Sequence, residues 1–560
     1  MAKARTRIID SNDGSIISLM EKTIRKNWTL PAYTNYGTGE TFTYGDVAKM
    51  IARLHRLFQQ LGIEPGNKIA LCDKNNAHWA IAFHAAFTYG AVVVPILSEF
   101  NIEQIQNIYD HSESVLMICG QKYADGLHAR ILNLADFTMK DEPAPDAAGN
   151  DDAKSEPRHS LPLSIDMQAF QDLQPGDIHY FRERPDDLAL LSYTSGSTGH
   201  SKGVMLPYRS VWSNMQFADE VLDFGPGDPT LAILPMAHMY GFSFDFLFEF
   251  CIGCHVHFLT KTPSPHIVIK AFSDIKPVVV IVVPLILEKI VQKQIFPLLR
   301  TRRIRALTAI PILKKVVYRQ IRNKLYAALG GNFYECIIGG AAFNKEVEDF
   351  LRQIHFPYTV GYGMTECGPI IGYEDWHLFA KGSCGKCVPR MQVRIDSPDP
   401  EHVPGEILAK GMNVMLGYYK NEQETLEAID EEGWLRTGDL GTMDAKGNIF
   451  IRGRKKTMLL GANGQNVYPE EIEDVIMTHT IFEESIVVQR GEKLVALVYV
   501  SEPALEHHGL TRETLLQHLD TYKRQINSYL PAFSNIAGIE VREQEFEKTP
   551  KRSIRRYLYS

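Results

Sequence analysis

The chain has 560 residues, 45% of them hydrophobic, and its 59 Lys and Arg against 67 Asp and Glu give a formal net charge of −8. A chain of this length exceeds the size at which one hydrophobic core keeps growing, so we expect two or more domains. The acidic balance argues against a nucleic-acid-binding surface, and eight Cys in so long a chain exclude a small disulfide-stapled scaffold.

The sequence carries no sign of a secretory signal or a membrane span. The cationic residues near the start precede no apolar stretch of adequate length, and the longest apolar run, residues 278–287, is too short for a bilayer. We expect that run to be a buried strand leading into a turn. The expected location is the cytoplasm, and peripheral contact with the inner face of a membrane stays open. We infer no partner protein.

The first predicted elements alternate between helix and strand. Residues 47–61 and 77–89 have apolar side chains at helical spacing, and residues 68–72 form a strand-like run between them. This alternation predicts layered α/β architecture. Residues 139–164 are rich in Asp, Glu, Pro, Ala and Ser, so we expect a mobile surface insertion there.

A segment crowded with hydroxyls and glycines, YTSGSTGHSKG, occupies residues 193–203. Its glycines let backbone N–H groups approach anionic oxygens, while its hydroxyls and lysine add hydrogen bonds and positive charge. Strand-like apolar runs on both sides favour a loop held in a sheet over a flexible linker, and the Walker pattern fails because its second glycine would fall at Ser201. We predict a polyphosphate-binding loop made of Thr194, Ser195, Gly196, Ser197, Thr198, Gly199 and Lys202.

This loop and the segments after it resemble the signature of the adenylate-forming superfamily, which includes acyl-CoA synthetases, peptide-synthetase adenylation domains and firefly luciferases. Five further motifs occur in the family's order across residues 234–469, so the resemblance covers most of the chain. It implies a large N-terminal domain of layered α/β subdomains with a β-rich subdomain, followed by a small mobile α+β domain. It also implies that a carboxylate attacks the α-phosphate of ATP, and that the acyl-adenylate is then attacked by the thiol of CoA.

The sequence changes character near Arg454, which supports that division. Before it, residues 433–451 have the short strands and turns of a β-rich subdomain. After it the pattern predicts a helix, two strands and a second helix, at residues 469–478, 484–500 and 511–530. We therefore expect domains at 1–455 and 456–560, with Lys456 at the hinge about which the resemblance implies a rotation.

Residues 361–369, GYGMTECGP, match the family's segment at the metal end of the nucleotide. The resemblance implies that Tyr362 stacks on adenine, that the Thr365 hydroxyl meets the α-phosphate, and that Glu366 binds Mg²⁺. Those roles suit an aromatic face and a hard carboxylate oxygen. Residues 339–342, GGAA, match the adenine-lining segment. The remaining nucleotide contacts expected from these two motifs are Gly340, Ala341, Gly363 and Met364.

Two further motifs extend the expected site. Residues 433–441, GWLRTGDLG, place Asp439 where the family uses a carboxylate to accept the ribose hydroxyls, and Arg454 matches a second ribose contact. His238 lies in LPMAHMYG, a segment that in the family ends near the acid's carboxylate, although a lone His is also compatible with a structural role. The stretch that follows, residues 239–250, holds five Phe and fits either an apolar tunnel or an aromatic core.

The family pattern fails near the C-terminus. The usual Lys-Thr-x-x-Gly-Lys-Ile reads KTPKRSI at residues 548–554, with Ser553 at the place of the catalytic lysine. A hydroxyl does not replace a cation in a desolvated site, and losing one such contact costs on the order of 3 kcal/mol of transition-state stabilisation. Three interpretations stay open: Lys551 or Arg552 enters the site, adenylation runs slowly without the contact, or the protein is a degenerate nucleotide- or acyl-adenylate-binding protein. Lys551 joins Thr194, Lys202, His238 and Glu366 as the candidate catalytic residues.

The overall pattern is most similar to bacterial long-chain fatty-acid–CoA ligases, partly through the run KPVVVIVVPLILEKI at residues 276–290. The resemblance therefore implies a ligase of fatty-acid metabolism that uses ATP, Mg²⁺ and CoA. Transfer to a carrier protein is the alternative acceptor. The length of the acyl chain and the oligomeric state do not follow from the sequence.

Overall fold

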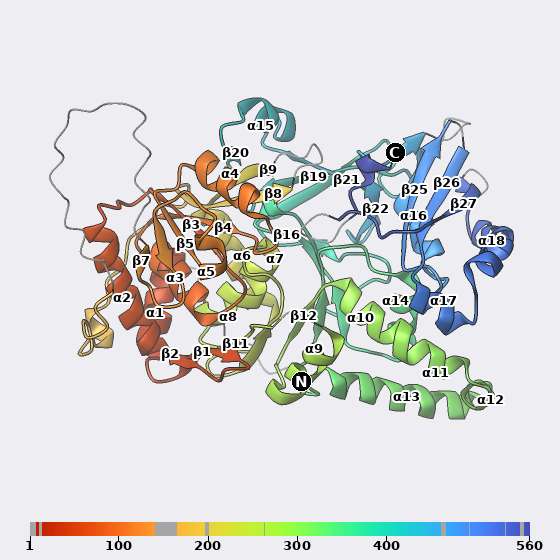
Figure 1. Ribbon diagram of the computed structural model, residues 1–560, viewed down its shortest axis with the longest axis horizontal. Helices are drawn as coiled ribbons and strands as arrows, with labels where there is room; N and C mark the ends of the chain where they lie inside the picture. Colours follow the sequence, from red (N-terminus) through yellow and green to blue (C-terminus); the bar gives the residue numbers. More distant parts are fainter. Residues whose placement is uncertain are drawn as a thin grey trace.

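A computed structural model describes residues 7–9, 14–140, 165–195, 201–261, 264–460, 466–491, 493–531, 534–548 and 554–559. Figure 1 shows the C-terminal residues, in blue, gathered as a separate body at one end of the molecule. Within the described ranges, no helix is both long enough and apolar enough to cross a membrane.

The largest sheet of the described chain has the strand order β20-β9-β8-β4-β3-β5-β6-β7. Its central pairs are parallel, whereas the pairs at both edges are antiparallel. The strands are β3 (Lys68–Cys72), β4 (Val92–Ile96), β5 (Leu116–Cys119), β6 (Ile131–Asn133), β7 (Met139–Lys140), β8 (Leu188–Ser195), β9 (Ser201–Pro207) and β20 (Gly417–Tyr418). Every residue of β4 is buried, as expected for a strand covered on both faces.

Helices α3 (Ala77–Thr88), α4 (Ile102–Ser112) and α6 (Tyr208–Val221) pack on this sheet, and α2 (Tyr44–Gln60) packs on α3. The side chain of Thr43 caps α2 in a reciprocal arrangement with Asp46, and Asn76 caps α3. All but one of the α3 residues are buried, because α3 packs between α2 and the sheet. These elements confirm the predicted alternation of helix and strand.

Two smaller sheets continue the layered α/β domain. One has the order β10-β11-β1-β2 and the other, all parallel, the order β12-β13-β14. Their strands are β1 (Pro31–Tyr36), β2 (Thr41–Thr43), β10 (Pro229–Ala232), β11 (His255–Leu259), β12 (Val280–Val282), β13 (Cys336–Ile338) and β14 (Tyr358–Val360). The predicted adenine and metal motifs begin directly after β13 and β14, where ligands bind in open parallel sheets.

The prediction for residues 278–287 is wrong in its second half. The strand covers only Val280–Val282, and Pro284 then begins helix α10 (Pro284–Ile290) instead of a turn. Proline is well suited to the first helical position, because the N–H that it lacks has no partner within the helix there. A chain of helices follows, namely η3 (Val291–Ile295), α11 (Phe296–Arg300), α12 (Arg302–Thr308) and α13 (Pro311–Ala328), with α13 along the lower edge of Figure 1.

The predicted β-rich part is an antiparallel sheet with the order β18-β19-β21-β22. Its strands are β18 (Met391–Asp396), β19 (Gly405–Gly411), β21 (Leu435–Met443) and β22 (Ile449–Arg454). Pairing of β21 with β22 places Asp439 directly opposite Arg454. Neighbouring strands thereby bring together two residues that the motifs single out separately.

The C-terminal part has its own hydrophobic core, centred on residues such as Ile472, Val498 and Leu515 and separate from the main core. It consists of α16 (Pro469–Ile476), β25 (Glu484–Arg490), β26 (Lys493–Tyr499), α17 (Glu502–His508), α18 (Arg512–Asn527) and β27 (Ile536–Arg542). This confirms a small C-terminal α+β domain. Of the expected insertion at 139–164, Met139–Lys140 form strand β7, and residues 141–164 lie outside the described residues.

Candidate functional site

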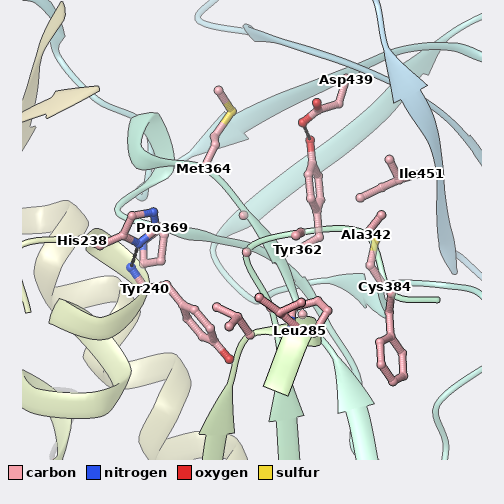
Figure 2. Close-up of a pocket in the computed structure, with 18 of the residues that line it drawn as sticks. His238, Tyr240, Leu285, Ala342, Tyr362, Met364, Pro369, Cys384, Asp439 and Ile451 are labelled. Carbon is pink, nitrogen blue, oxygen red and sulfur yellow. Dashed lines mark hydrogen bonds between the residues drawn. The ribbon is translucent and has the colours of Figure 1, made fainter. Parts of the chain in front are cut away.

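A cavity of about 2290 Å³ lies between the large domain and the C-terminal domain and is lined by residues of both. Its walls include Thr194 of β8 and Lys202 of β9, the segments after β13 and β14, and the facing strands β21 and β22. The C-terminal domain contributes Glu470, Glu471, Glu473, Asp474 and residues 554–557. Figure 2 shows part of this cavity, with Tyr362, Met364 and Ala342 around a common space.

Tyr362, Asp439 and Arg454 form a connected polar cluster in the cavity wall. The Tyr362 hydroxyl donates a 2.8 Å hydrogen bond to Oδ2 of Asp439, and Nε of Arg454 lies 3.1 Å from Oδ1. Burial raises the pKa of the Asp439 carboxyl, while Arg454 and the Tyr362 hydroxyl act in the opposite direction. Burial also raises the pKa of the Tyr362 phenol, so it stays a neutral donor. The cluster is a preorganised acceptor for hydroxyl groups.

Glu366 lies in the short 3-10 helix η4 (Thr365–Cys367) and lines the same cavity. Its Oε1 accepts a 3.0 Å hydrogen bond from the hydroxyl of Tyr418, on strand β20. The Thr365 side chain is buried beside it. This hydrogen bond fixes the orientation of the Glu366 carboxylate, whose oxygens have the chemistry to bind a cation.

The predicted polyphosphate loop joins two strands of a hairpin. Cross-strand pairing places Thr194 opposite Lys202 and Ser195 opposite Ser201, so both strands end at the cavity. Nζ of Lys202 lies 2.5 Å from Glu424 and 5.1 Å from the centre of the Tyr418 ring. The tip of the loop, with the predicted residues Gly196, Ser197, Thr198 and Gly199, lies outside the described residues.

Small residues are required where the two glycine-containing motifs line the cavity. Gly340 has φ +88°, a left-handed conformation that side chains disfavour. A Cβ on Gly363 would lie 2.2 Å from the carbonyl oxygen of Pro369, and one on Gly339 would lie 3.0 Å from the Tyr240 ring. Ala341 lies next to them in the lining. The close packing explains why these positions carry almost no side chain.

His238 precedes helix α7 (Met239–Phe242), and its Nδ1 accepts a 3.3 Å hydrogen bond from the Tyr240 N–H, as Figure 2 shows. The imidazole lines the cavity, so one residue combines a helix cap with a place in the site. Of the five Phe that follow, Phe244 lines the cavity. The others are fully buried in the aromatic core, including Phe246 against Tyr33 and Trp79.

Two family models match the chain, one described as AMP-binding enzyme over residues 20–419 and one as AMP-binding enzyme C-terminal domain over residues 456–559. The chain belongs to the AMP-binding enzyme family. This confirms the resemblance to the adenylate-forming superfamily that the motifs indicate, together with a large N-terminal and a small C-terminal domain.

Relatives of this AMP-binding enzyme differ in the acid that their names state. 4-Coumarate–CoA ligase 2 of Oryza sativa subsp. japonica is 28% identical over 522 residues, covering 88% of this chain and 85% of the relative. A long-chain-fatty-acid–CoA ligase of Escherichia coli is 26% identical over 541 residues, covering 91% and 90%. The Bacillus subtilis o-succinylbenzoate–CoA synthetase in complex with ATP and magnesium has a TM-score of 0.72 at 18% identity, covering 96% and 98%, which concerns the fold alone.

Three cavity-lining residues of this AMP-binding enzyme, Tyr418, Glu424 and Arg556, lie outside the sequence motifs. Tyr418 contacts Glu366 from strand β20, which pairs with β9. Glu424 contacts Lys202 from helix α15 (Glu422–Ala428), which packs on β20, and no local pattern reveals either contact. Arg556 lines the cavity and pairs with Glu473 of helix α16. Two consecutive arginines directly after Ile554 are a sequence signal that could indicate a cation at the site. Lys551, the predicted catalytic cation, lies outside the described residues, as do Arg552 and Ser553.

Proposed function

We propose that this enzyme is an acid–thiol ligase that activates a long-chain fatty acid with ATP and transfers the acyl group to CoA. The family and the named relatives support acyl-CoA ligase chemistry, and the long acyl chain of the substrate is our own inference. The proposal rests on the cavity, which contains both the polar cluster and an apolar wall. Its volume of about 2290 Å³ exceeds the roughly 300–1,000 Å³ of ordinary small-molecule pockets. That apolar wall includes Phe217, Val221, Leu222, Phe244 and Val268.

The polar cluster supports a nucleotide role. The Asp439 carboxylate, oriented by Tyr362 and Arg454, would accept the two ribose hydroxyls of ATP, and the Tyr362 ring would lie against adenine. Gly340, Ala341, Gly363 and Met364 would leave room for the flat base. These assignments are proposals that rest on burial, hydrogen bonding and the motif resemblance.

The charged end of the cavity suits the phosphates. Mg²⁺ fits beside Glu366, whose carboxylate is a hard oxygen ligand already oriented by Tyr418, and when bound it would neutralise phosphate charge. Lys202 and the hydroxyls of Thr194 and Thr365 would hold phosphate oxygens from the protein side. His238 would face the carboxylate of the acid.

The two half-reactions are proposed to use two domain arrangements. A carboxylate oxygen forms a bond to the α-phosphorus of ATP and pyrophosphate leaves; the CoA sulfur then bonds to the acyl carbon and AMP leaves. We propose the domain boundary at Lys456, which lines the cavity two residues after Arg454. Lys551 stays our candidate for the adenylation cation, with Arg556 as the alternative within the described residues.

The test uses purified protein with ATP, Mg²⁺ and CoA and either palmitate or 4-coumarate, following pyrophosphate release and the thioester by mass spectrometry. The proposal expects palmitoyl-CoA at a rate well above that of the coumaroyl thioester. The relatives include ligases for both acids, so 4-coumarate is the matched competitor. A preference for 4-coumarate would overturn the fatty-acid proposal and leave the ligase chemistry intact. Adenylate that reaches a carrier protein but never CoA would overturn the choice of acceptor.

A further inference from the structure

Positive charge is concentrated in one segment of this acidic chain. Between Glu288 and Glu335 the sequence has eleven Lys and Arg and no Asp or Glu, whereas acidic residues outnumber basic ones over the whole chain, 67 to 59. The segment contains helices α11, α12 and α13, which we call the basic arm (residues 296–328). Figure 1 shows α12 and α13 at the periphery of the molecule, with α13 along its lower edge. A surface with this density of cations favours binding to an anionic partner.

The arm is held at its two ends, by the buried Phe296 at its start and by the second half of α13, while the junction between α12 and α13 is exposed. Helix α13 has two buried residues, Ile321 and Leu325, both in its second half, whereas α12 has none. Residues 309–316, at the junction of α12 and α13, are all exposed. The junction therefore projects from the protein surface and makes few packing contacts of its own.

This exposed junction carries apolar side chains that the fold leaves in solvent. Ile312 is 76% exposed, Ile310 50% and Val316 49%. Ile312 and Val316 are four residues apart and share one face of α13, with Lys315 and Arg319 as neighbours on that face. Clustered aliphatic groups in water are unfavourable, at roughly 25 cal/mol per Å² of apolar surface, unless a partner covers them.

The cations of the arm are available to such a partner. In the part of the chain that the structure describes, none of the Lys and Arg from Arg302 to Lys324 forms a salt bridge, whereas cations elsewhere, such as Lys381 and Arg390, do. A helix with exposed aliphatic residues flanked by Lys and Arg matches a surface that lies in the headgroup region of an anionic bilayer. Nucleic acid would use the cations but leave the aliphatic groups uncovered.

We propose that the basic arm docks this protein on anionic lipid membranes, with Ile310, Ile312 and Val316 entering the headgroup region and the flanking cations binding lipid phosphates. Helix α10 lines the cavity through Leu285 and Ile286 and is joined through η3 to α11, the first helix of the arm. Docking there would place a lipid source near the apolar wall. That last consequence rests on the proposed fatty-acid substrate, whereas docking itself does not.

The test is flotation of the full-length protein with phosphatidylcholine vesicles, prepared with and without phosphatidylglycerol, in the absence of substrates. The wild type should float with the anionic vesicles and not with the neutral ones, and added salt should weaken binding. Lys314→Glu with Lys315→Glu should reduce the affinity at least about 30-fold, from about 1 kcal/mol per cation at an anionic surface. The matched control, Lys446→Glu with Lys493→Glu, makes the same charge change at two exposed lysines elsewhere.

A second variant measures the apolar contribution to vesicle binding and includes a check that the protein is folded. Ile312→Ser with Val316→Ser keeps every charge and should also weaken vesicle binding, with an unchanged circular dichroism spectrum and unchanged ligase activity in detergent-solubilised substrate. The proposal is overturned if the arm and control variants bind alike, if neutral vesicles bind the wild type equally well, or if the arm prefers RNA to anionic vesicles. Because the flotation assay contains no substrate, failure to bind vesicles leaves the ligase proposal untouched.

Discussion

The Tyr362 hydroxyl donates a 2.8 Å hydrogen bond to the Asp439 carboxylate, although the two residues are 77 positions apart in the chain. Tyr362 follows a parallel strand of the α/β domain, and Asp439 lies in the antiparallel sheet next to it. The bond therefore ties the two subdomains together at the wall of the cavity. Arg454 approaches the same carboxylate from the opposite strand, so the acceptor is held from two sides.

Substitutions at Asp439 should separate its charge from its structural role. Asp439→Asn keeps an acceptor for Tyr362 but removes the charge, so we expect the KM for ATP to rise about tenfold with little loss of stability. Asp439→Ala leaves the buried Tyr362 hydroxyl unpaired and should also lower the free energy of unfolding by about 1–3 kcal/mol. Steady-state kinetics and urea unfolding measure the two effects. An Asn variant with an unchanged KM for ATP would contradict the ribose assignment.

Glu366→Gln should reduce magnesium-dependent pyrophosphate release by about 100-fold, because it removes the charged oxygen that suits the cation. Tyr418→Phe is the matched control: it keeps the carboxylate and loses only the hydrogen bond that orients it. We expect that control to raise the magnesium concentration needed for half-maximal rate without abolishing activity. Equal losses in both variants would point to a structural role for Glu366.

Asp474 should make stability depend on pH near neutrality. Burial raises the pKa of its carboxyl to about 7, with Lys345 of the large domain acting against burial and Glu473 reinforcing it. A raised pKa means that the protonated form stabilises the fold at low pH, and that this stabilisation is lost as the pH rises through about 7. Between about pH 6 and pH 8 the wild type should lose about 1 kcal/mol of unfolding free energy more than Asp474→Asn. Parallel pH profiles for the two proteins would contradict this.

The C-terminal cation can be identified by half-reaction kinetics. Lys551→Ala should slow pyrophosphate release by about 100-fold while leaving thioester formation from supplied acyl-adenylate nearly unchanged. Arg556→Ala is the comparison, because Arg556 pairs with Glu473 inside the cavity. If Arg556→Ala alone slows adenylation, the displaced-lysine hypothesis is wrong and Arg556 carries the charge.

Much of the fold follows from local pattern. The predicted strand at residues 68–72 and the helices at 77–89 and 469–478 appear within two residues of their expected limits. These elements have strong apolar periodicity or clear caps, so local signals and tertiary packing agree. Helix α10 was missed because Pro284 reads both as a break after a strand and as the first residue of a helix.

Contacts between distant segments limit how much of the site a sequence predicts. Tyr362, Asp439 and Arg454 were singled out from separate motifs, and the structure brings them into contact. Tyr418 depends on long-range strand pairing, and Glu424 on a helix that packs on the same strand, and no local pattern encodes either arrangement. The exposure of Ile312 was equally invisible, since a sequence shows an apolar residue in a helix but not which neighbours cover it.

The most direct measurement uses palmitate labelled with heavy oxygen in its carboxylate, incubated with the enzyme, ATP, Mg²⁺ and CoA. If the carboxylate attacks the α-phosphate, one labelled oxygen ends in AMP, and palmitoyl-CoA forms in equal amount. Label in inorganic phosphate with ADP as the nucleotide product, or AMP without label, would contradict the proposed activation of a fatty acid as its adenylate.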